Sequence, residues 1–184
     1  MALSNCGLDK SAIKGVLFDL DGTLADTAPD LIYALNLGLV DAGFEKCKLE
    51  QVKHAITHGS LALVKAALPN IDEVVQRQIQ HGLLEHYKII NGDKSCLFSQ
   101  LNELLTLLDK QNIPYGIVTN KHACFARPLV KKLGLTSRVK SIVSGDSTIY
   151  SKPHPAPMLL AAQQIGIPSQ SILYLGDAER DLVA

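Results

Sequence analysis

The sequence predicts an α/β fold in which a doubly wound parallel sheet carries an inserted, wholly helical cap. Two observations predict it: four short apolar runs alternate with helical patterns, and one long block near the N-terminus contains helical patterns only. The chain has 184 residues, of which 47% are hydrophobic. It can therefore bury the core of one domain together with a sizeable insertion.

The first predicted strand is an apolar run, residues 14–18, that ends in acidic and glycine residues, as a buried parallel strand does at its carboxyl end. In residues 29–90, apolar residues recur three and four positions apart, and no strand pattern interrupts them. That block is too long for a simple crossover between two strands. The sequence therefore predicts a helical cap, residues 25–94, inserted into an α/β core of residues 1–24 and 95–184.

The rest of the core alternates between helix and strand. The predicted strands are residues 113–118, 139–143 and 171–175, and the predicted helices are residues 99–111, 122–133 and 155–165. The chain stops about two turns into the helix expected after the last strand. We therefore expect the C-terminal part of the core to be missing and residues 172–175 to form an uncovered apolar edge. Dimerisation through that edge, and the oligomeric state in general, stay open.

Composition excludes several classes of protein. Eighteen basic residues balance eighteen acidic ones, so no overall field attracts nucleic acid or an anionic membrane. No apolar run approaches the roughly 18 residues of a membrane span, and the N-terminus lacks a signal-peptide pattern. We expect a cytoplasmic protein whose partner is a small molecule. No paired C-x-x-C spacing occurs, which predicts reduced and mostly buried thiols at Cys6, Cys47, Cys96 and Cys124.

Chemically competent residues follow the predicted strands. In open α/β sheets, ligands bind beyond the carboxyl ends of the strands. Asp19 and Asp21 are separated by one residue, and both side chains can reach the same site if the chain turns at Gly22. The sequence places DLDGT (residues 19–23) after the first strand, Thr119-Asn120 after the second, Lys152 in the segment after the third, and GDAERD (residues 176–181) after the last.

This set of residues suits phosphoryl transfer. A carboxylate that attacks phosphorus forms an aspartyl-phosphate, but an anionic nucleophile that meets an anionic ester requires positive charge nearby. Mg²⁺ prefers hard oxygen ligands and keeps several waters, so Asp19, a backbone oxygen of Asp21 and Asp177 form a suitable ligand set. Lys152 supplies further positive charge, while Asp181 orients waters or that lysine.

The four motifs, in this order, resemble those of the haloacid dehalogenase-like (HAD) hydrolase superfamily, and the match spans almost the whole chain. The resemblance implies a Rossmann-like parallel sheet core and a magnesium-dependent phosphatase. It also implies that Asp19 is the nucleophile and Asp21 the general acid and then base. Thr119 and Asn120 would bind the phosphate, Lys152 would clamp the charge, and Asp177 would bind the metal. Dehalogenases lack the second aspartate, so Asp21 favours phosphate chemistry.

Within the superfamily, DLDGTLADTAPDL, VTNK and SKPHPAP look like the phosphoglycolate phosphatase group. The stretch VTNKHACFARPLVKKLGL is also similar to N-acetylmuramic acid 6-phosphate phosphatase. His154 stands where the family pattern SKPDP has an acid, which changes the local charge but leaves Lys152 in place. The expected substrate is a small phosphomonoester such as 2-phosphoglycolate, and N-acetylmuramic acid 6-phosphate is the alternative.

Other interpretations stay open at this stage. Each motif alone fits a polar turn or a helix cap, and a truncated, catalytically poor phosphate-binding remnant or a phosphomutase remains an alternative. His58, Gly59 and Ser60 interrupt the predicted cap helices, where a loop facing the phosphate would select the substrate; a simple helix break explains them equally well. Lys121 is a candidate substrate contact, and the alternative is a solvated residue at the start of a helix.

Overall fold

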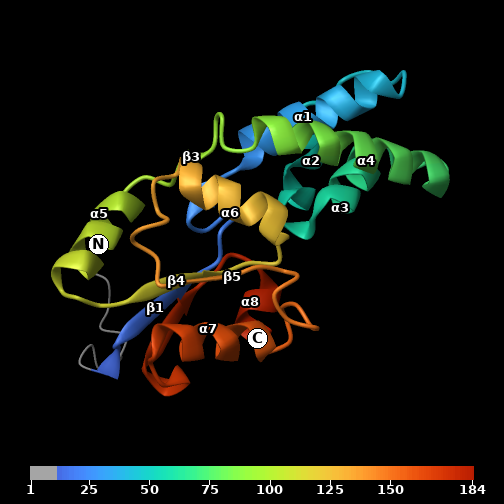
Figure 1. Ribbon diagram of the computed structural model, residues 1–184. Coiled ribbons are helices and arrows are strands. Elements are labelled where there is room, and N and C mark those ends of the chain that lie inside the picture. Colours follow the sequence, from blue (N-terminus) through green and yellow to red (C-terminus); the bar gives the residue numbers. More distant parts are fainter. Residues whose placement is uncertain (1–11) are drawn as a thin grey trace, which may run out of the picture.

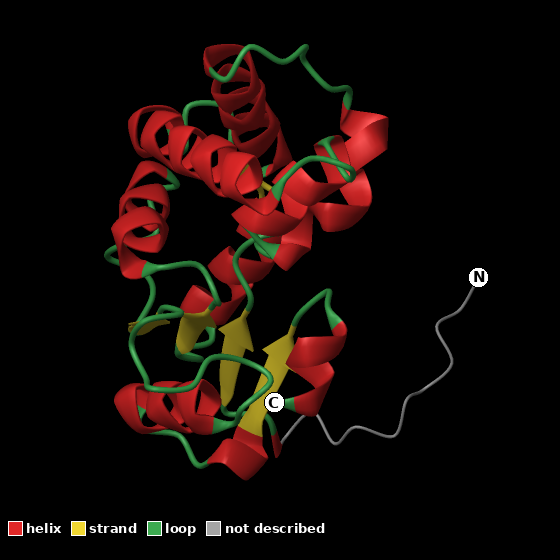
Figure 2. Cartoon of the chain, turned by 90° about the vertical axis from the view of Figure 1, so that its right-hand side faces the viewer, coloured by secondary structure: helices red, strands yellow, loops and turns green. Residues whose placement is uncertain are grey.

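The computed structural model describes residues 12–184. A parallel sheet lies in one half of the molecule and a group of helices in the other (Figures 1 and 2). The sheet has four strands in the order β5-β4-β1-β6, all of them parallel. The strands are β1 (Gly15–Phe18), β4 (Tyr115–Val118), β5 (Ser141–Val143) and β6 (Ile172–Leu175). The predicted α/β fold with a parallel sheet is confirmed.

The strand order places the reversal of the sheet at β1. From β1 the chain builds outward through β4 to β5, and it then returns to add β6 on the other side of β1. Val16 therefore pairs with Tyr115 of β4 on one side and with Leu173 of β6 on the other. Ligands of open α/β sheets bind at such a reversal, beyond the carboxyl ends of the strands, so the end of β1 is where a site is expected.

Helices cover both faces of the sheet because alternate residues of the strands point to opposite sides. Val16 and Phe18 pack on the face covered by α5 (Leu101–Lys110) and α6 (Ala123–Lys132). Leu17 packs on the opposite face, against α7 (Ala156–Ile165). The 3₁₀ turn η3 (Ser169–Ser171) comes directly before β6, and the short helix α8 (Glu179–Val183) comes after it.

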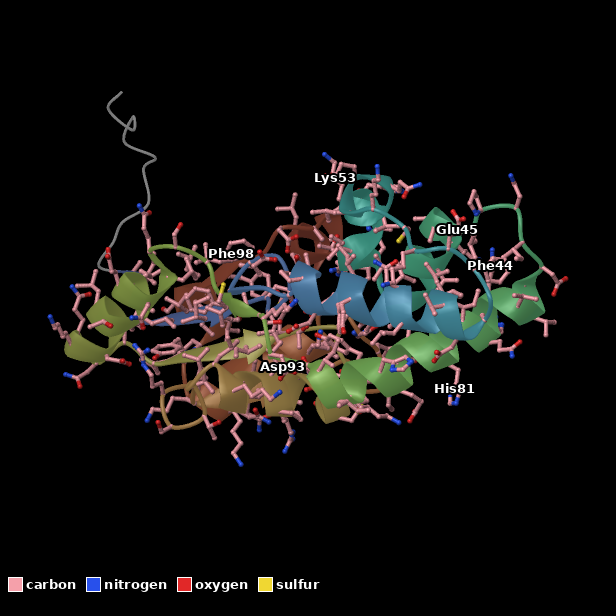
Figure 3. The ribbon with its side chains drawn as sticks, turned by 90° about the horizontal axis from the view of Figure 1, so that it is seen from above. Phe44, Glu45, Lys53, His81, Asp93 and Phe98 are labelled. Atoms are coloured by element: carbon pink, nitrogen blue, oxygen red, sulfur yellow. The ribbon has the colours of Figure 1, made fainter. Side chains whose placement is uncertain are left out.

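The second half of the molecule is helical. It comprises α1 (Ala28–Asp41), α2 (Leu49–Val52), the 3₁₀ helix η2 (Lys53–His58), α3 (Ser60–Ala67) and α4 (Glu73–Ile90). Figure 3 shows α1 and α4 side by side, with His81 of α4 projecting away from α1. Their backbones approach closely because Gly38 has no side chain: a Cβ there would lie 2.8 Å from the Leu83 nitrogen. These helices share a buried cluster of their own, which Phe125 of α6 joins.

Two chain segments connect the halves, and they pair with each other. β2 (Ala25–Asp26) and β3 (Cys96–Leu97) form an antiparallel ribbon. Strands of two residues carry no readable alternation, which is why the sequence did not indicate them. We propose to keep 24/25 and 94/95 as the borders between core and cap, because the ribbon lies at these borders.

The elements differ from the sequence predictions mainly at their ends. Helix α5 starts at Leu101 rather than at Ser99, because Gln100 adopts a left-handed conformation before it. β6 is an edge strand of the described sheet, as expected, and its residues are half-buried. The prediction of mostly buried thiols is wrong: Cys47 is half-buried, Cys96 and Cys124 are exposed, and Cys6 lies outside the described residues.

No helix within residues 12–184 is long and apolar enough to cross a membrane.

Candidate active site

Asp19 continues the line of β1 at its carboxyl end. Its backbone amide donates to the Leu175 carbonyl at 2.8 Å, so it is still held by the neighbouring strand. Its side chain is buried, and its Oδ1 accepts a hydrogen bond of 2.7 Å from the Leu20 amide. Burial raises the pKa of the Asp19 carboxyl to about 6, although the charge of Lys152 acts in the opposite direction.

Lys152 lies beneath this carboxylate with its side chain fully buried. Its Nζ is 3.2 Å from Asp19 Oδ1 and 2.7 Å from Asp181 Oδ1. The same ammonium donates to the Val118 carbonyl at 2.9 Å and to the Tyr174 hydroxyl at 2.8 Å. Asp181 and these two oxygens engage all three ammonium donors, so Lys152 acts on Asp19 chiefly through its charge.

Thr119 and Asn120 follow β4, as predicted. The Thr119 side chain is buried beside the end of β1, and its Oγ1 accepts from the Lys121 amide at 3.1 Å. The Asn120 side chain instead holds the backbone of Lys152: Nδ2 donates to the Lys152 carbonyl at 2.8 Å, and Oδ1 accepts from the Lys152 amide at 3.0 Å. Gly145 allows this loop to pack, since a Cβ there would lie 2.2 Å from the Asn120 carbonyl oxygen.

Three carboxylates from the two ends of the described chain meet at this site. Asp19, Asp177 and Asp181 each offer an oxygen, and the three oxygens lie within 4.8 Å of one another. Burial opposes the ionisation of Asp181, but its hydrogen bond from Lys152 holds the pKa of that carboxyl below its usual value. Asp177 is exposed and accepts from the Thr23 hydroxyl at 2.9 Å. Clustered hard oxygens around one point fit a divalent cation such as Mg²⁺.

The Asp21 side chain is less buried than that of Asp19, with 16% of it exposed against 2%. Its Oδ1 accepts from the Thr27 hydroxyl at 2.6 Å and from Lys121 Nζ at 2.8 Å. Although burial acts in the opposite direction, the charge of Asp21 keeps the pKa of Lys121 above its usual value. Lys121 is therefore not a solvated surface residue: only 9% of its side chain is exposed.

A cavity of about 560 Å³ joins these residues to the helical half of the molecule. Its lining contains most of the residues that the sequence singled out, and it also contains cap residues of η2, α3 and α4. From the core come Asp19, Asp21, Thr119, Asn120, Lys121, His122, Phe125, Ser151 and Arg180; from the cap come Leu31, Ile56, Thr57, His58, Gly59, Ser60, Leu61, Leu63, Gln80, Leu84 and Tyr87. The structure thus brings His58, Gly59 and Ser60 to the same cavity as the predicted nucleophile.

Three side chains at the site were not indicated as functional by the sequence. Arg180 Nη2 lies 3.8 Å from Asp19 Oδ2, and this arginine was visible in GDAERD but had no assigned role. Tyr174 and Tyr87 lie within apolar patterns of a strand and a helix, which hid their hydroxyl groups among core positions. No spacing signal in the sequence separates such tyrosines from ordinary core residues.

A family model described as haloacid dehalogenase-like hydrolase matches residues 16–184. The chain belongs to this family. Among its relatives, a phosphoglycolate phosphatase of Xanthomonas campestris is 34% identical over 171 residues, which cover 93% of this chain and 77% of the relative. An N-acetylmuramic acid 6-phosphate phosphatase of Pseudomonas aeruginosa is 34% identical over 176 residues, which cover 95% and 78%.

Solved structures of HAD proteins share the fold. The crystal structure of a predicted phosphoglycolate phosphatase from Haemophilus somnus matches with a TM-score of 0.83 and 26% identity, covering 95% of this chain and 81% of that one. A hydrolase fold, relatives named as phosphatases and a carboxylate cluster beside a buried lysine agree with one another. The chain is accordingly a phosphoric monoester hydrolase of the HAD family.

Proposed function

We propose that this HAD hydrolase is a magnesium-dependent phosphatase that cleaves a small phosphomonoester through an aspartyl-phosphate on Asp19. One observation carries the proposal: a buried ammonium, that of Lys152, lies 3.2 Å from the carboxylate that ends β1, which in turn lies among the acidic groups of Asp177 and Asp181. A nucleophile, its charge partner and a cation site therefore meet at one edge of the sheet.

The first displacement uses the free oxygen of Asp19. Oδ1 is engaged by the Leu20 amide and faces Lys152, which leaves Oδ2 for attack on phosphorus. As the new oxygen–phosphorus bond forms, the bond from phosphorus to the ester oxygen breaks, and Asp21 gives a proton to the departing alcohol. In the second displacement, a water oxygen attacks the phosphorus of the aspartyl-phosphate while Asp21 takes a water proton. Inorganic phosphate leaves, and Asp19 is regenerated.

Positive charge and donors balance the anionic groups during both steps. Lys152 offsets the charge of Asp19, Arg180 lies beside Oδ2, and the Thr119 hydroxyl and neighbouring amides are placed to bind oxygens of the transferred group. Asp19, a backbone oxygen of Asp21 and Asp177 would hold Mg²⁺, with Asp181 supporting them. When bound, Mg²⁺ supplies charge stabilisation to the phosphoryl oxygens.

The substrate that we propose is 2-phosphoglycolate, with N-acetylmuramic acid 6-phosphate as the second candidate. Relatives named for each activity are 34% identical to this chain, so identity does not separate them. Cap residues such as His58 and Ser60 border the same cavity as the nucleophile, which supports a role for them in substrate choice. The alternative is a phosphate-binding remnant, which would bind Mg²⁺ and phosphate but hydrolyse phosphate esters poorly.

The test is the release of phosphate from p-nitrophenyl phosphate and from the two candidate substrates, with and without Mg²⁺. We expect magnesium-dependent turnover that Asp19→Asn abolishes, whereas Glu50→Gln, a change of an exposed cap carboxylate, leaves it unaltered. Rapid quenching should capture phosphate covalently bound to the wild-type protein. Binding of Mg²⁺ and phosphate without turnover would instead identify the remnant and overturn the proposal.

A further inference from the structure

Helix α4 forms a wall of the active-site cavity with one of its faces. Gln80, Leu84 and Tyr87, spaced four and three residues apart, all line it. Leu84 is apolar, and the Gln80 amide is engaged by a hydrogen bond of 2.9 Å to the Ser60 hydroxyl. Among these three residues, Tyr87 is the one whose side chain has a fully buried polar atom without a partner within residues 12–184.

The Tyr87 hydroxyl is in an unusual state. The residue is only 1% exposed, and its oxygen has no hydrogen-bond partner within residues 12–184. Buried tyrosine hydroxyls usually find a partner, because leaving a buried polar group unpaired is costly. A ligand in the cavity that accepts a hydrogen bond would supply one.

Lys121 has unused hydrogen-bonding capacity at the same place. Its ammonium lies 4.7 Å from the centre of the Tyr87 ring. It makes one side-chain hydrogen bond to a described residue, that to Asp21, although an ammonium has three donors. A nearly buried cation with free donors, next to a hydroxyl without a partner, is suited to an anionic acceptor with two oxygens.

We propose that Lys121 and Tyr87 bind a carboxylate of the substrate, and that this pair makes the enzyme specific for esters whose phosphate is next to a carboxylate. The inference rests on the proposed function. One carboxylate oxygen accepts from the Lys121 ammonium and the other from the Tyr87 hydroxyl.

The position of Asp21 fixes where in the substrate this carboxylate belongs. Asp21 delivers its proton to the ester oxygen, and Lys121 Nζ is 2.8 Å from the same aspartate. The group that binds Lys121 is therefore a few bonds from the ester oxygen, as in 2-phosphoglycolate and other 2-phosphooxy acids. In N-acetylmuramic acid 6-phosphate, the phosphate esterifies the C6 hydroxyl outside the sugar ring, and the lactyl carboxylate is attached through the oxygen on C3. The two groups are therefore many bonds apart.

The experiment compares two esters that differ only in the group of interest: 2-phosphoglycolate and 2-hydroxyethyl phosphate. We expect the wild-type kcat/KM to favour the carboxylate by at least about 100-fold, the scale of a hydrogen-bonded buried charge. Lys121→Met should lower kcat/KM for 2-phosphoglycolate about 100-fold and change that for 2-hydroxyethyl phosphate much less. Tyr87→Phe should lower the former about 5- to 10-fold, mainly through KM. Lys131→Met, on the exposed side of α6, should change neither.

A measurement of ligand binding distinguishes loss of the carboxylate site from poor folding of the Lys121→Met variant. In the Asp19→Asn background, which does not turn over, 2-phosphoglycolate should raise the melting temperature more than 2-hydroxyethyl phosphate does. Adding Lys121→Met should remove that difference while the shift caused by inorganic phosphate remains.

Each contrary result has a separate meaning. Equal losses on both esters would show that Lys121 acts through Asp21 alone, which overturns the carboxylate site and leaves the phosphatase intact. A Lys121-dependent preference for N-acetylmuramic acid 6-phosphate over N-acetylglucosamine 6-phosphate would also overturn it, because the carboxylate would then be remote from the ester. Absence of wild-type turnover of every ester with Mg²⁺ would refute the proposed function itself.

Discussion

Lys152 Nζ lies 3.2 Å from Asp19 Oδ1, and both side chains are almost completely removed from solvent. Asp181 shares the same ammonium at 2.7 Å, so one buried positive charge faces two carboxylates. This imbalance favours further positive charge, part of which the Arg180 guanidinium supplies at 3.8 Å from Asp19 Oδ2. Asp177 adds a third carboxylate to the group, so the cluster favours a bound cation. The excess of acidic groups that suits the protein for a metal is also what makes this region costly to fold.

Lys152→Met should destabilise the protein strongly. Removing one partner of a buried ion pair leaves uncompensated charge, which typically costs about 3–5 kcal/mol. Here two carboxylates, those of Asp19 and Asp181, lose their partner at once. We expect this loss in the free energy of unfolding from urea denaturation without metal. Mg²⁺ should restore part of it, because the cation replaces the missing positive charge.

Lys131→Met is the matched control for this change, because Lys131 lies exposed near the end of α6. Its effect should stay within about 0.5 kcal/mol. If Lys152→Met is as stable as this control variant, the ion pair with Asp19 does not hold the site together.

Asp19→Asn should stabilise the metal-free protein at neutral pH. The folded-state pKa of Asp19 is about 6, above the value of 3.8 for the free side chain. The folded protein therefore binds this proton more tightly, and its stability falls as the pH rises from 4 to 6. A shift of about two units corresponds to about 3 kcal/mol. The variant should match the wild type at pH 4 and exceed it by roughly that amount at pH 8, in urea denaturation with a metal chelator present.

An exposed acid provides the comparison. Glu50→Gln makes the same kind of substitution at an exposed position and should change the free energy of unfolding by no more than about 0.5 kcal/mol. A gap between Asp19→Asn and wild type that stays constant from pH 4 to pH 8 would contradict the raised pKa of Asp19.

The sequence predicted the parallel sheet, and the edge at which the candidate site residues gather, because both depend on local patterns. The run ending at Phe18 and the acids that follow it are contiguous, and parallel strands necessarily bring their carboxyl ends to one edge. Thr119 and Lys152 could therefore be assigned to the site before their contacts were known. The helical pattern between the first two strands likewise predicted the cap helices.

Interactions between distant residues could not be predicted in the same way. The engagement of Asn120 by the Lys152 backbone, and the proximity of Tyr87 to Lys121, depend on how loops and helices pack together. The role of Asp30 could not be predicted either. In the sequence it is an acid in the first turn of a helix, whereas in the structure its carboxylate binds the segment before β3, the second of the two connections between core and cap.

Asp30→Ala should loosen the connection between core and cap. Its buried carboxylate accepts hydrogen bonds from the amides of Gly92, Lys94 and Ser95 and from the Ser95 hydroxyl. Truncation leaves these donors without their acceptor, which should cost about 3 kcal/mol of folding free energy. Hydrogen exchange of the three amides should accelerate more than that of amides in β1.

Asp93→Asn, in the same segment, removes only an exposed ion pair with Lys132 and should cost less than about 1 kcal/mol. Unchanged amide exchange at Gly92, Lys94 and Ser95 in Asp30→Ala would show that the connection is held by other contacts.

Gly22→Ala should weaken magnesium binding through Asp177. Gly22 has φ +85°, and a Cβ there would lie 2.5 Å from Asp177 Oδ2, so the added methyl group must displace that carboxylate. The backbone strain alone is matched by Gly134→Ala, since Gly134 has φ +72° and a Cβ there would meet no described atom within 4 Å. Both variants should lose about 1 kcal/mol of stability from that strain.

A titration with Mg²⁺, monitored by the melting temperature and by phosphatase activity, separates the effect of backbone strain from that of displacing the Asp177 carboxylate. Gly134→Ala should keep the wild-type midpoint, whereas Gly22→Ala should require at least about tenfold more magnesium, as should Asp177→Asn. If Gly22→Ala and Gly134→Ala share the wild-type midpoint while Asp177→Asn does not, the carboxylate adjusts around the methyl group. If all three share it, Asp177 is not a ligand, and the cation must be held by Asp19 and Asp181 without help from the exposed end of the cluster.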